Sequence, residues 1–144
     1  MTLYLDTSSL VKLYVAEPES ASVRRLVENA DIVATAAIAY PEARAALARR
    51  RREGGLRPGV FTAAKRALDD DWPRYLVVDV TVALCRDAGD LAERHGLRGY
   101  DSVHLAAYLQ VVRAASKAKV RFSCFDDRLT AASRSATRRI KPTG

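Results

Sequence analysis

The sequence predicts a three-layer α/β/α sandwich around a central, mostly parallel sheet of four to five strands. Short apolar runs alternate with helical segments along the whole chain, and this alternation favours a parallel sheet covered on both faces. No internal repeat or interdomain linker interrupts the pattern. With 144 residues, 49% of them hydrophobic, the chain can build one core, so we expect a single domain over residues 1–144.

The expected strands are apolar or β-branched runs bounded by turn residues. They cover residues 3–5, 32–35, 75–80 and 120–125, with a candidate edge strand at 138–141. The expected helices begin near Ser or Pro, or show helical spacing of apolar and Ala residues. They cover residues 10–16, 20–29, 39–52, 58–70, 82–95, 101–116 and 128–134.

Charge and cysteine content narrow the class of protein. The net charge of +7 and the isoelectric point near 9.8 favour a polyanionic partner, nucleic acid first and an acidic protein second. Cys85 and Cys124 lack the spacing of a zinc site or a disulfide framework. No secretory signal and no apolar run long enough to span a membrane is present, so we expect a cytoplasmic protein.

Four acids stand where an α/β sheet binds its ligands. Asp6 and Asp126 directly follow predicted strands, Asp101 begins a helix after a glycine-containing loop, and Glu42 lies near the start of another helix. Ligands of open α/β sheets bind outside the carboxyl ends of the strands. We therefore expect these acids to share one crevice, where a divalent cation would remove their mutual repulsion.

A hard cation such as Mg²⁺ prefers oxygen ligands and suits phosphate substrates. It can polarise a phosphoryl oxygen and activate water, so hydrolysis of a phosphodiester needs no nucleophilic side chain. Only His95 and His104 could serve as imidazole bases, and we expect His104 to be buried or to support a ligand. The sequence predicts a metal-dependent nuclease.

Each acid also has a purely structural interpretation. Asp6 and Asp101 are consistent with helix N-caps, and Glu42 in a first turn is favoured by the helix dipole. Of the adjacent pair Asp126 and Asp127, one is expected to be only a cap. The set in this strand–helix order is more specific than any single member.

Four segments in order resemble the PIN-domain nucleases, and more closely the VapC toxins of bacterial type II toxin–antitoxin pairs. They are residues 3–14, 40–47, 97–107 and 125–132. The resemblance implies Mg²⁺- or Mn²⁺-dependent cleavage of single-stranded or structured RNA. It also implies a cognate VapB-like antitoxin and a homodimer.

The same resemblance implies roles for individual residues. Asp6, Glu42 and Asp101 match the core metal ligands, and Asp126 matches the more variable fourth acid, a role that Asp127 could share or take over. Ser8 matches a hydroxyl residue that supports the metal ligands, although it could also be a plain helix cap.

Several alternatives stay open. Pro41 directly precedes Glu42, so the helix could begin or bend there and change the aim of the carboxylate. The run 49–52 of four arginines could be a solvated helix end or a contact to RNA phosphates. Tyr14 and Tyr40 could stack on bases, but core packing is expected.

Other functions compete with the nuclease. A catalytically silent RNA- or protein-binding module of the same fold would retain RNA without cutting it. A metal-dependent phosphatase or a DNA-directed nuclease would use a similar sheet.

Overall fold

A computed structural model describes residues 1–115 and 119–140 of the chain. Its four strands form one parallel sheet in the order β3-β2-β1-β4. The strands are β1 (Thr2–Leu5), β2 (Ile32–Ala36), β3 (Leu76–Val78) and β4 (Val120–Ser123). The parallel sheet is therefore confirmed, with four strands in the described residues.

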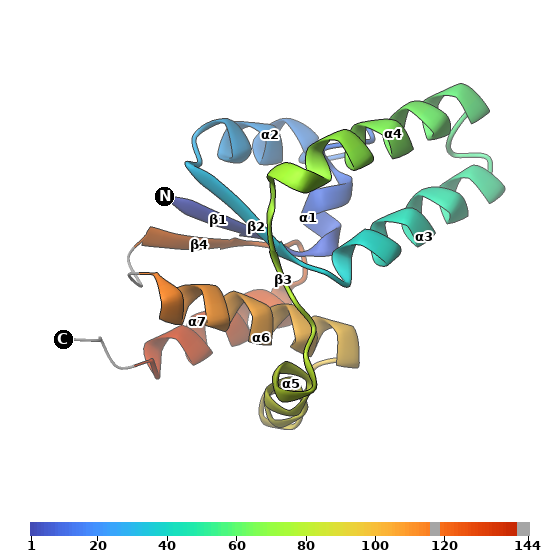
Figure 1. Cartoon of the computed structure of the whole chain (residues 1–144). Coiled ribbons are helices and arrows are strands. Elements are labelled where there is room, and N and C mark those ends of the chain that lie inside the picture. Colours follow the sequence, from blue (N-terminus) through green and yellow to red (C-terminus); the bar gives the residue numbers. More distant parts are fainter. Residues whose placement is uncertain (116–118, 141–144) are drawn as a thin grey trace.

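Helices cover both faces of this sheet, which confirms the α/β/α sandwich (Figure 1). One face carries α1 (Thr7–Val11), α2 (Ser20–Glu28), α3 (Ala39–Arg52) and α4 (Pro58–Asp71). The other face carries α5 (Val82–His95), α6 (Gly99–Ala114) and α7 (Asp127–Arg138). The 3-10 turn η1 (Trp72–Arg74) leads from α4 into β3.

The alternation of side chains along β1 divides the core into two halves. Leu3 and Leu5 are fully buried against α1 to α4, whereas Tyr4, equally buried, points to α5, α6 and α7. This is the period of two that a strand imposes. Both faces of β1 are apolar because helices cover both.

Helix α1 differs from its prediction. It spans Thr7–Val11 rather than residues 10–16, because Asp6, and not a serine, is its N-cap. After Val11 the backbone hydrogen bonds span three residues instead of four, as in the 3.1 Å bond from Leu13 N to Leu10 O. The helix thus begins directly at the end of β1, which brings Asp6 to the edge of the sheet.

The predicted edge strand over 138–141 is wrong in its described part. Helix α7 continues through Arg138, residues 139 and 140 form a turn, and Lys141 lies outside the described residues. The helix continues because Leu129, Ala132 and Ala136 lie on one face of it and are buried in the core. Two strands also end two residues before their predicted ends: β3 stops at Val78 and β4 at Ser123.

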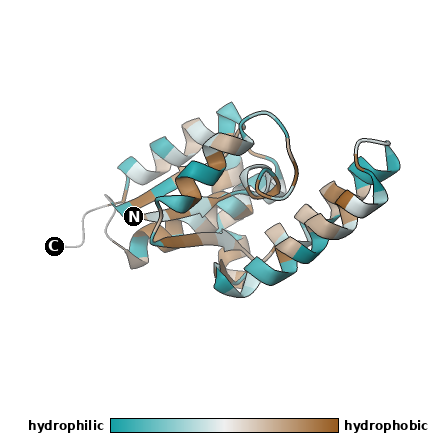
Figure 2. Cartoon of the chain, turned by 90° about the horizontal axis from the view of Figure 1, so that it is seen from above, coloured by the Kyte–Doolittle hydropathy of each residue, from teal (hydrophilic) through white to brown (hydrophobic). Residues whose placement is uncertain are grey.

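Helices α3 and α4 run beyond the sheet as a hairpin (Figure 1). The turn between them uses Gly54 in the left-handed region, at φ +79°, a backbone conformation that other residues adopt at a cost. Figure 2 shows hydrophilic residues along the outer sides of the helices. Among residues 1–115 and 119–140, the helices fall short of the length and apolar character needed to cross a bilayer.

Candidate active site

A small pocket of about 200 Å³ opens at the carboxyl ends of β1 and β4. The four acids singled out in the sequence all line it: Asp6, Glu42, Asp101 and Asp126. Asp6 follows β1, Asp126 follows the loop after β4, and the other two come from the first turns of α3 and α6. The expected crevice therefore exists, and the sheet edge brings together residues up to 120 positions apart.

Asp6 is both a helix cap and a pocket residue. Its Oδ1 accepts hydrogen bonds from the backbone N of Ser9 at 3.0 Å and from the hydroxyl of Ser8 at 2.7 Å. The side chain is buried, and this burial raises its pKa above the ordinary value, with the charge of Asp101 adding to the shift. The bonds from Ser8 and Ser9 and the proximity of His104 act in the opposite direction.

Glu42 is held by a chain of hydrogen bonds that ends in the core. The hydroxyl of Thr7 donates to Glu42 Oε1 at 2.7 Å, and His104 Nε2 lies 3.0 Å from the same oxygen. On the far side of the ring, Nδ1 of His104 meets the buried hydroxyl of Tyr4 at 2.9 Å. Pro41 does not begin the helix, since it is the third residue of α3.

This series of hydrogen bonds determines which nitrogen of the His104 imidazole carries a hydrogen. Nε2 must be protonated, because a bare nitrogen would face the carboxylate oxygen of Glu42 at 3.0 Å. Burial raises the pKa of the Tyr4 hydroxyl well above its usual value, so this hydroxyl stays neutral. His104 is thus the buried supporting residue expected from the sequence, whereas Thr7 and Tyr4 were missed.

Asp101 is held more loosely than Asp6 and Glu42. Its Oδ2 pairs with Arg98 Nε at 3.1 Å, and the Arg98 side chain is 65% exposed. Both residues lie at the start of α6, where the Asp is also favoured by the helix dipole. An exposed pair of this kind contributes little and can separate easily.

The structure separates Asp126 from Asp127. Asp126 is the N-cap of α7, with its Oδ1 2.8 Å from Leu129 N, and it lines the pocket. Asp127 is exposed and lies outside the pocket lining. Ser8 joins the two sides, since its hydroxyl accepts from Phe125 N at 3.3 Å while donating to Asp6.

Two aromatic side chains at the rim were not predicted. Tyr100 and Phe125 line the pocket, and each is 44% exposed. A cation lies over each ring: Arg98 is 5.0 Å from the centre of Tyr100, and Lys12 is 4.5 Å from that of Phe125. The available signal was that each of them directly precedes one of the acids in the sequence. Tyr14 and Tyr40 instead pack around Trp72 and Tyr75, as expected.

The pocket suits a hard cation in its chemistry. Its donors toward such an ion are carboxylate and hydroxyl oxygens, and buried Asp6 is bonded there only to neutral donors. In the described part of the chain, however, no three Asp, Glu, His or Cys side chains converge closely enough to hold an ion as they stand. His95, the other imidazole, lies at the end of α5 and does not line the pocket.

Comparison with known proteins identifies the family. The PIN domain family model matches residues 3–133. Ribonuclease VapC45 of Mycobacterium tuberculosis is 38% identical over 109 residues, which are 76% of each chain.

Solved structures share the fold. VapC20 of Mycobacterium tuberculosis, described as a sarcin–ricin loop cleaving toxin, aligns with a TM-score of 0.63 at 22% identity, covering 90% of this chain and 94% of that one. VapBC2 of Rickettsia felis, solved with a DNA fragment from its promoter, aligns with a TM-score of 0.53 at 14% identity, covering 86% and 100%. Together with the family match and the VapC relative, the pocket leads to one conclusion: the chain belongs to the PIN domain family, in its VapC group.

Proposed function

We propose that this protein is the toxin component of a type II toxin–antitoxin pair and acts as a divalent-metal-dependent endoribonuclease. The observation that carries the proposal is the pocket in which buried Asp6 faces Glu42, Asp101 and Asp126. The name of the VapC45 relative, a ribonuclease, supports RNA as the substrate. All described elements pack around one sheet, so we treat residues 1–144 as a single PIN-like nuclease domain.

The four acids would hold the ion, Mg²⁺ first and Mn²⁺ as a substitute. When bound, the ion supplies Lewis acidity toward a phosphoryl oxygen and activates water for hydrolysis. The chain itself keeps the carboxylates oriented: Ser8 and the N–H of Ser9 hold Asp6, and Thr7 with His104 holds Glu42. Asp101 pairs with Arg98 through Oδ2 alone, which leaves its Oδ1 for the ion, and the exposed guanidinium of Arg98 would be available to a phosphate.

Asp126 rather than Asp127 is our proposed fourth acid, since only Asp126 lines the pocket. Its capping bond to Leu129 N uses Oδ1, which leaves Oδ2 for an ion. Ser8 supports the site by fixing Asp6 against the loop after β4. The structural and functional interpretations of Asp6 and Asp126 are thus compatible, because one carboxylate can serve both.

The proposed partners follow from membership in the VapC group. A VapB-like antitoxin would inhibit the nuclease, and we propose a homodimer as the assembly that it engages. Co-expression with a candidate VapB-like antitoxin, followed by purification of a complex, would test the antitoxin.

The decisive experiment compares wild type with Asp6→Asn on RNA in Mg²⁺. We expect a loss on the order of 10³-fold, since several kcal/mol of transition-state stabilisation would be removed. EDTA should abolish cleavage by the wild type. Asp87→Asn, on the exposed side of α5, removes the same charge and should keep full activity. RNA cleavage by Asp6→Asn at the wild-type rate would refute the proposal, as would activity confined to DNA or to a phosphomonoester.

A further inference from the structure

A second hollow, of about 700 Å³, adjoins the acid pocket between α1 and α3. The two hollows share Thr7, Ser8, Glu42 and Tyr100 in their linings. In the second one four cationic side chains outnumber two acids, Glu17 and Glu42; the cations are Lys12, Arg49, Arg50 and Arg52. A polyanion whose reacting phosphate lies in the acid pocket would therefore continue into a positively charged channel, which we call the basic groove.

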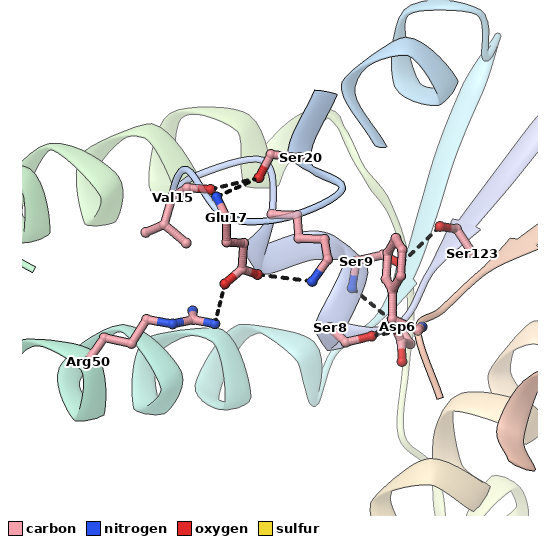
Figure 3. Close-up of polar contacts among 10 residues, drawn as sticks. Asp6, Ser8, Ser9, Val15, Glu17, Ser20, Arg50 and Ser123 are labelled. Atoms are coloured by element: carbon pink, nitrogen blue, oxygen red, sulfur yellow. Dashed lines mark hydrogen bonds and ion pairs between the residues drawn. The ribbon is translucent and has the colours of Figure 1, made fainter. Parts of the chain in front are cut away.

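Two of these cations are joined through one carboxylate. Glu17 Oε1 lies 3.1 Å from Lys12 Nζ, and Glu17 Oε2 lies 2.7 Å from Arg50 Nη2. The side chains of Lys12 and Glu17 are 14% and 19% exposed, whereas that of Arg50 is 35% exposed, so Arg50 is the most open member of the cluster. Figure 3 shows Glu17 pointing toward Arg50 across the space between α1 and α3. With two cations and one anion, the cluster retains a net positive charge.

Both cations keep unused binding capacity. Arg50 meets Glu17 through a single nitrogen, and its other terminal nitrogen, Nη1, is buried without a hydrogen-bond partner in the described residues. Lys12 gives one hydrogen bond to Glu17 and lies over the half-exposed ring of Phe125 at the pocket rim. The Arg50 side chain is nevertheless 35% exposed, so part of its guanidinium faces the basic groove.

The position of Glu17 is fixed from the backbone as well. Its N–H donates to the hydroxyl of Ser20 at 3.1 Å, and that hydroxyl donates to Val15 O at 3.0 Å (Figure 3). Glu19 between them adopts φ 72°, a left-handed conformation that costs energy for a non-glycine residue. The loop therefore holds the carboxylate in one place, and the carboxylate in turn holds both cations.

We propose that Lys12, Arg50 and Phe125 form a subsite for the RNA strand where it leaves the acid pocket, with Glu17 as the residue that positions the two cations. The subsite extends the nuclease function proposed above and depends on it. Lys12 and Arg50 would contact backbone phosphates, and the ring of Phe125 would stack on a base. Cations that follow a backbone beside an exposed aromatic ring are typical of single-stranded nucleic-acid binding.

The test is binding of a labelled single-stranded oligoribonucleotide to full-length protein in EDTA, measured by fluorescence anisotropy between 50 and 200 mM salt. Glu17→Gln adds one positive charge, so simple charge attraction predicts tighter binding. The subsite predicts the reverse, a loss of about tenfold, and a salt slope lower by about 0.7 for each phosphate that the variant no longer binds. Glu28→Gln at the exposed end of α2 makes the same charge change and should not weaken binding.

A combined variant separates positioning from a general folding defect. In a protein that already carries Lys12→Met and Arg50→Met, adding Glu17→Gln should weaken RNA binding no further, because Glu17 acts only by positioning those two residues. Phe125→Leu should weaken binding by about tenfold, because leucine offers no ring for a base to stack on. In cleavage assays Glu17→Gln should raise KM for RNA and leave kcat nearly unchanged.

The outcomes distinguish the subsite from the nuclease. Equal or tighter binding by Glu17→Gln would overturn the subsite even where the wild type cuts RNA. A wild type that cuts no RNA, with binding still weakened by Glu17→Gln but not by Glu28→Gln, would refute the nuclease and support an RNA-binding role for the groove.

Discussion

The two sides of the acid pocket are built differently. Asp6 and Glu42 lie against the core, where hydrogen bonds from Ser8, Ser9, Thr7 and His104 hold them. Asp101 and Asp126 stand in or beside the first turns of α6 and α7. Of these two, Asp101 is engaged only by the exposed Arg98 among the described residues. Asp126 is fixed by its capping bond from Leu129 N, so three of the acids are ordered in advance and Asp101 is the one that can adapt.

This difference suggests how the pocket would assemble around an ion and a phosphate. The ordered acids would bind first, at little entropic cost, because their carboxylates are already oriented. Asp101, which is held only by the exposed Arg98 among the described residues, would then adjust to the ion. Four sets of variants would test that division, from the largest expected effect to the smallest.

The buried chain behind Glu42 should matter most. His104→Ala is expected to lower RNA cleavage by about 10- to 100-fold, the usual consequence of removing a group that orients a metal ligand. Tyr4→Phe keeps the aromatic packing and should lose less, about tenfold. The matched control is Tyr108→Phe, a buried tyrosine in the same aromatic cluster whose hydroxyl meets Thr137 instead. Equal losses for the two Tyr→Phe variants would show that the chain does not orient Glu42.

Substitutions of Asp126 and Asp127 should differ in their effect on cleavage. Asn caps helices as well as Asp does, so Asp126→Asn should keep α7 while lowering cleavage by about tenfold. Asp127→Asn should change the rate less than about twofold, since surface substitutions of this kind rarely matter. Circular dichroism would confirm intact helices. A larger loss for Asp127→Asn would transfer the role of fourth acid to Asp127.

Removing Arg98 should release Asp101. Because an exposed ion pair contributes about 0–1 kcal/mol, Arg98→Met should tighten Mn²⁺ binding by at most about fivefold, while KM for RNA rises. Calorimetric titration of the metal would measure the first effect, and Arg94→Met, exposed on α5, controls for the change in net charge. Weaker Mn²⁺ binding by Arg98→Met would mean that the pair orders Asp101 for the ion and does not compete with it.

The smallest effect concerns stability without metal. Burial raises the pKa of Asp6, so its ionised form destabilises the fold at neutral pH, and in EDTA Asp6→Asn should melt a few degrees above the wild type. Protonated Asp6 stabilises the fold fully when the pH is below the pKa of Asp6 in the unfolded chain. This stabilisation is lost as the pH rises through the higher pKa that Asp6 has in the folded protein. The gap in Tm should therefore shrink on acidification and disappear below about pH 4. A difference in Tm that widens at low pH would contradict a raised pKa of the buried Asp6.

Much of the fold follows from local patterns in the chain. The helix bounds at residues 39–52 and 82–95 agree with the structure, because Ala-rich or amphipathic segments ending at glycines are defined locally. The ends of β4 and α7 were misjudged. Phe125 is the last residue of an apolar run in the sequence, and the run predicts a strand up to it. In the structure β4 ends at Ser123, and Phe125 lies in the loop directly before Asp126, the N-cap of α7. Caps of this kind depend on where the chain turns, which hydrophobicity does not reveal.

For the site, the sequence by itself determined the acids, their order along the chain and the edge of the sheet at which they meet. Strand–helix alternation is a local property, and parallel strands place their carboxyl ends together. Tertiary structure alone decided that Tyr4 and Thr7 meet His104, and that Glu17 joins Lys12 to Arg50. These contacts join residues up to 100 positions apart, and they form because packing, with no local signal, brings their side chains within hydrogen-bond distance.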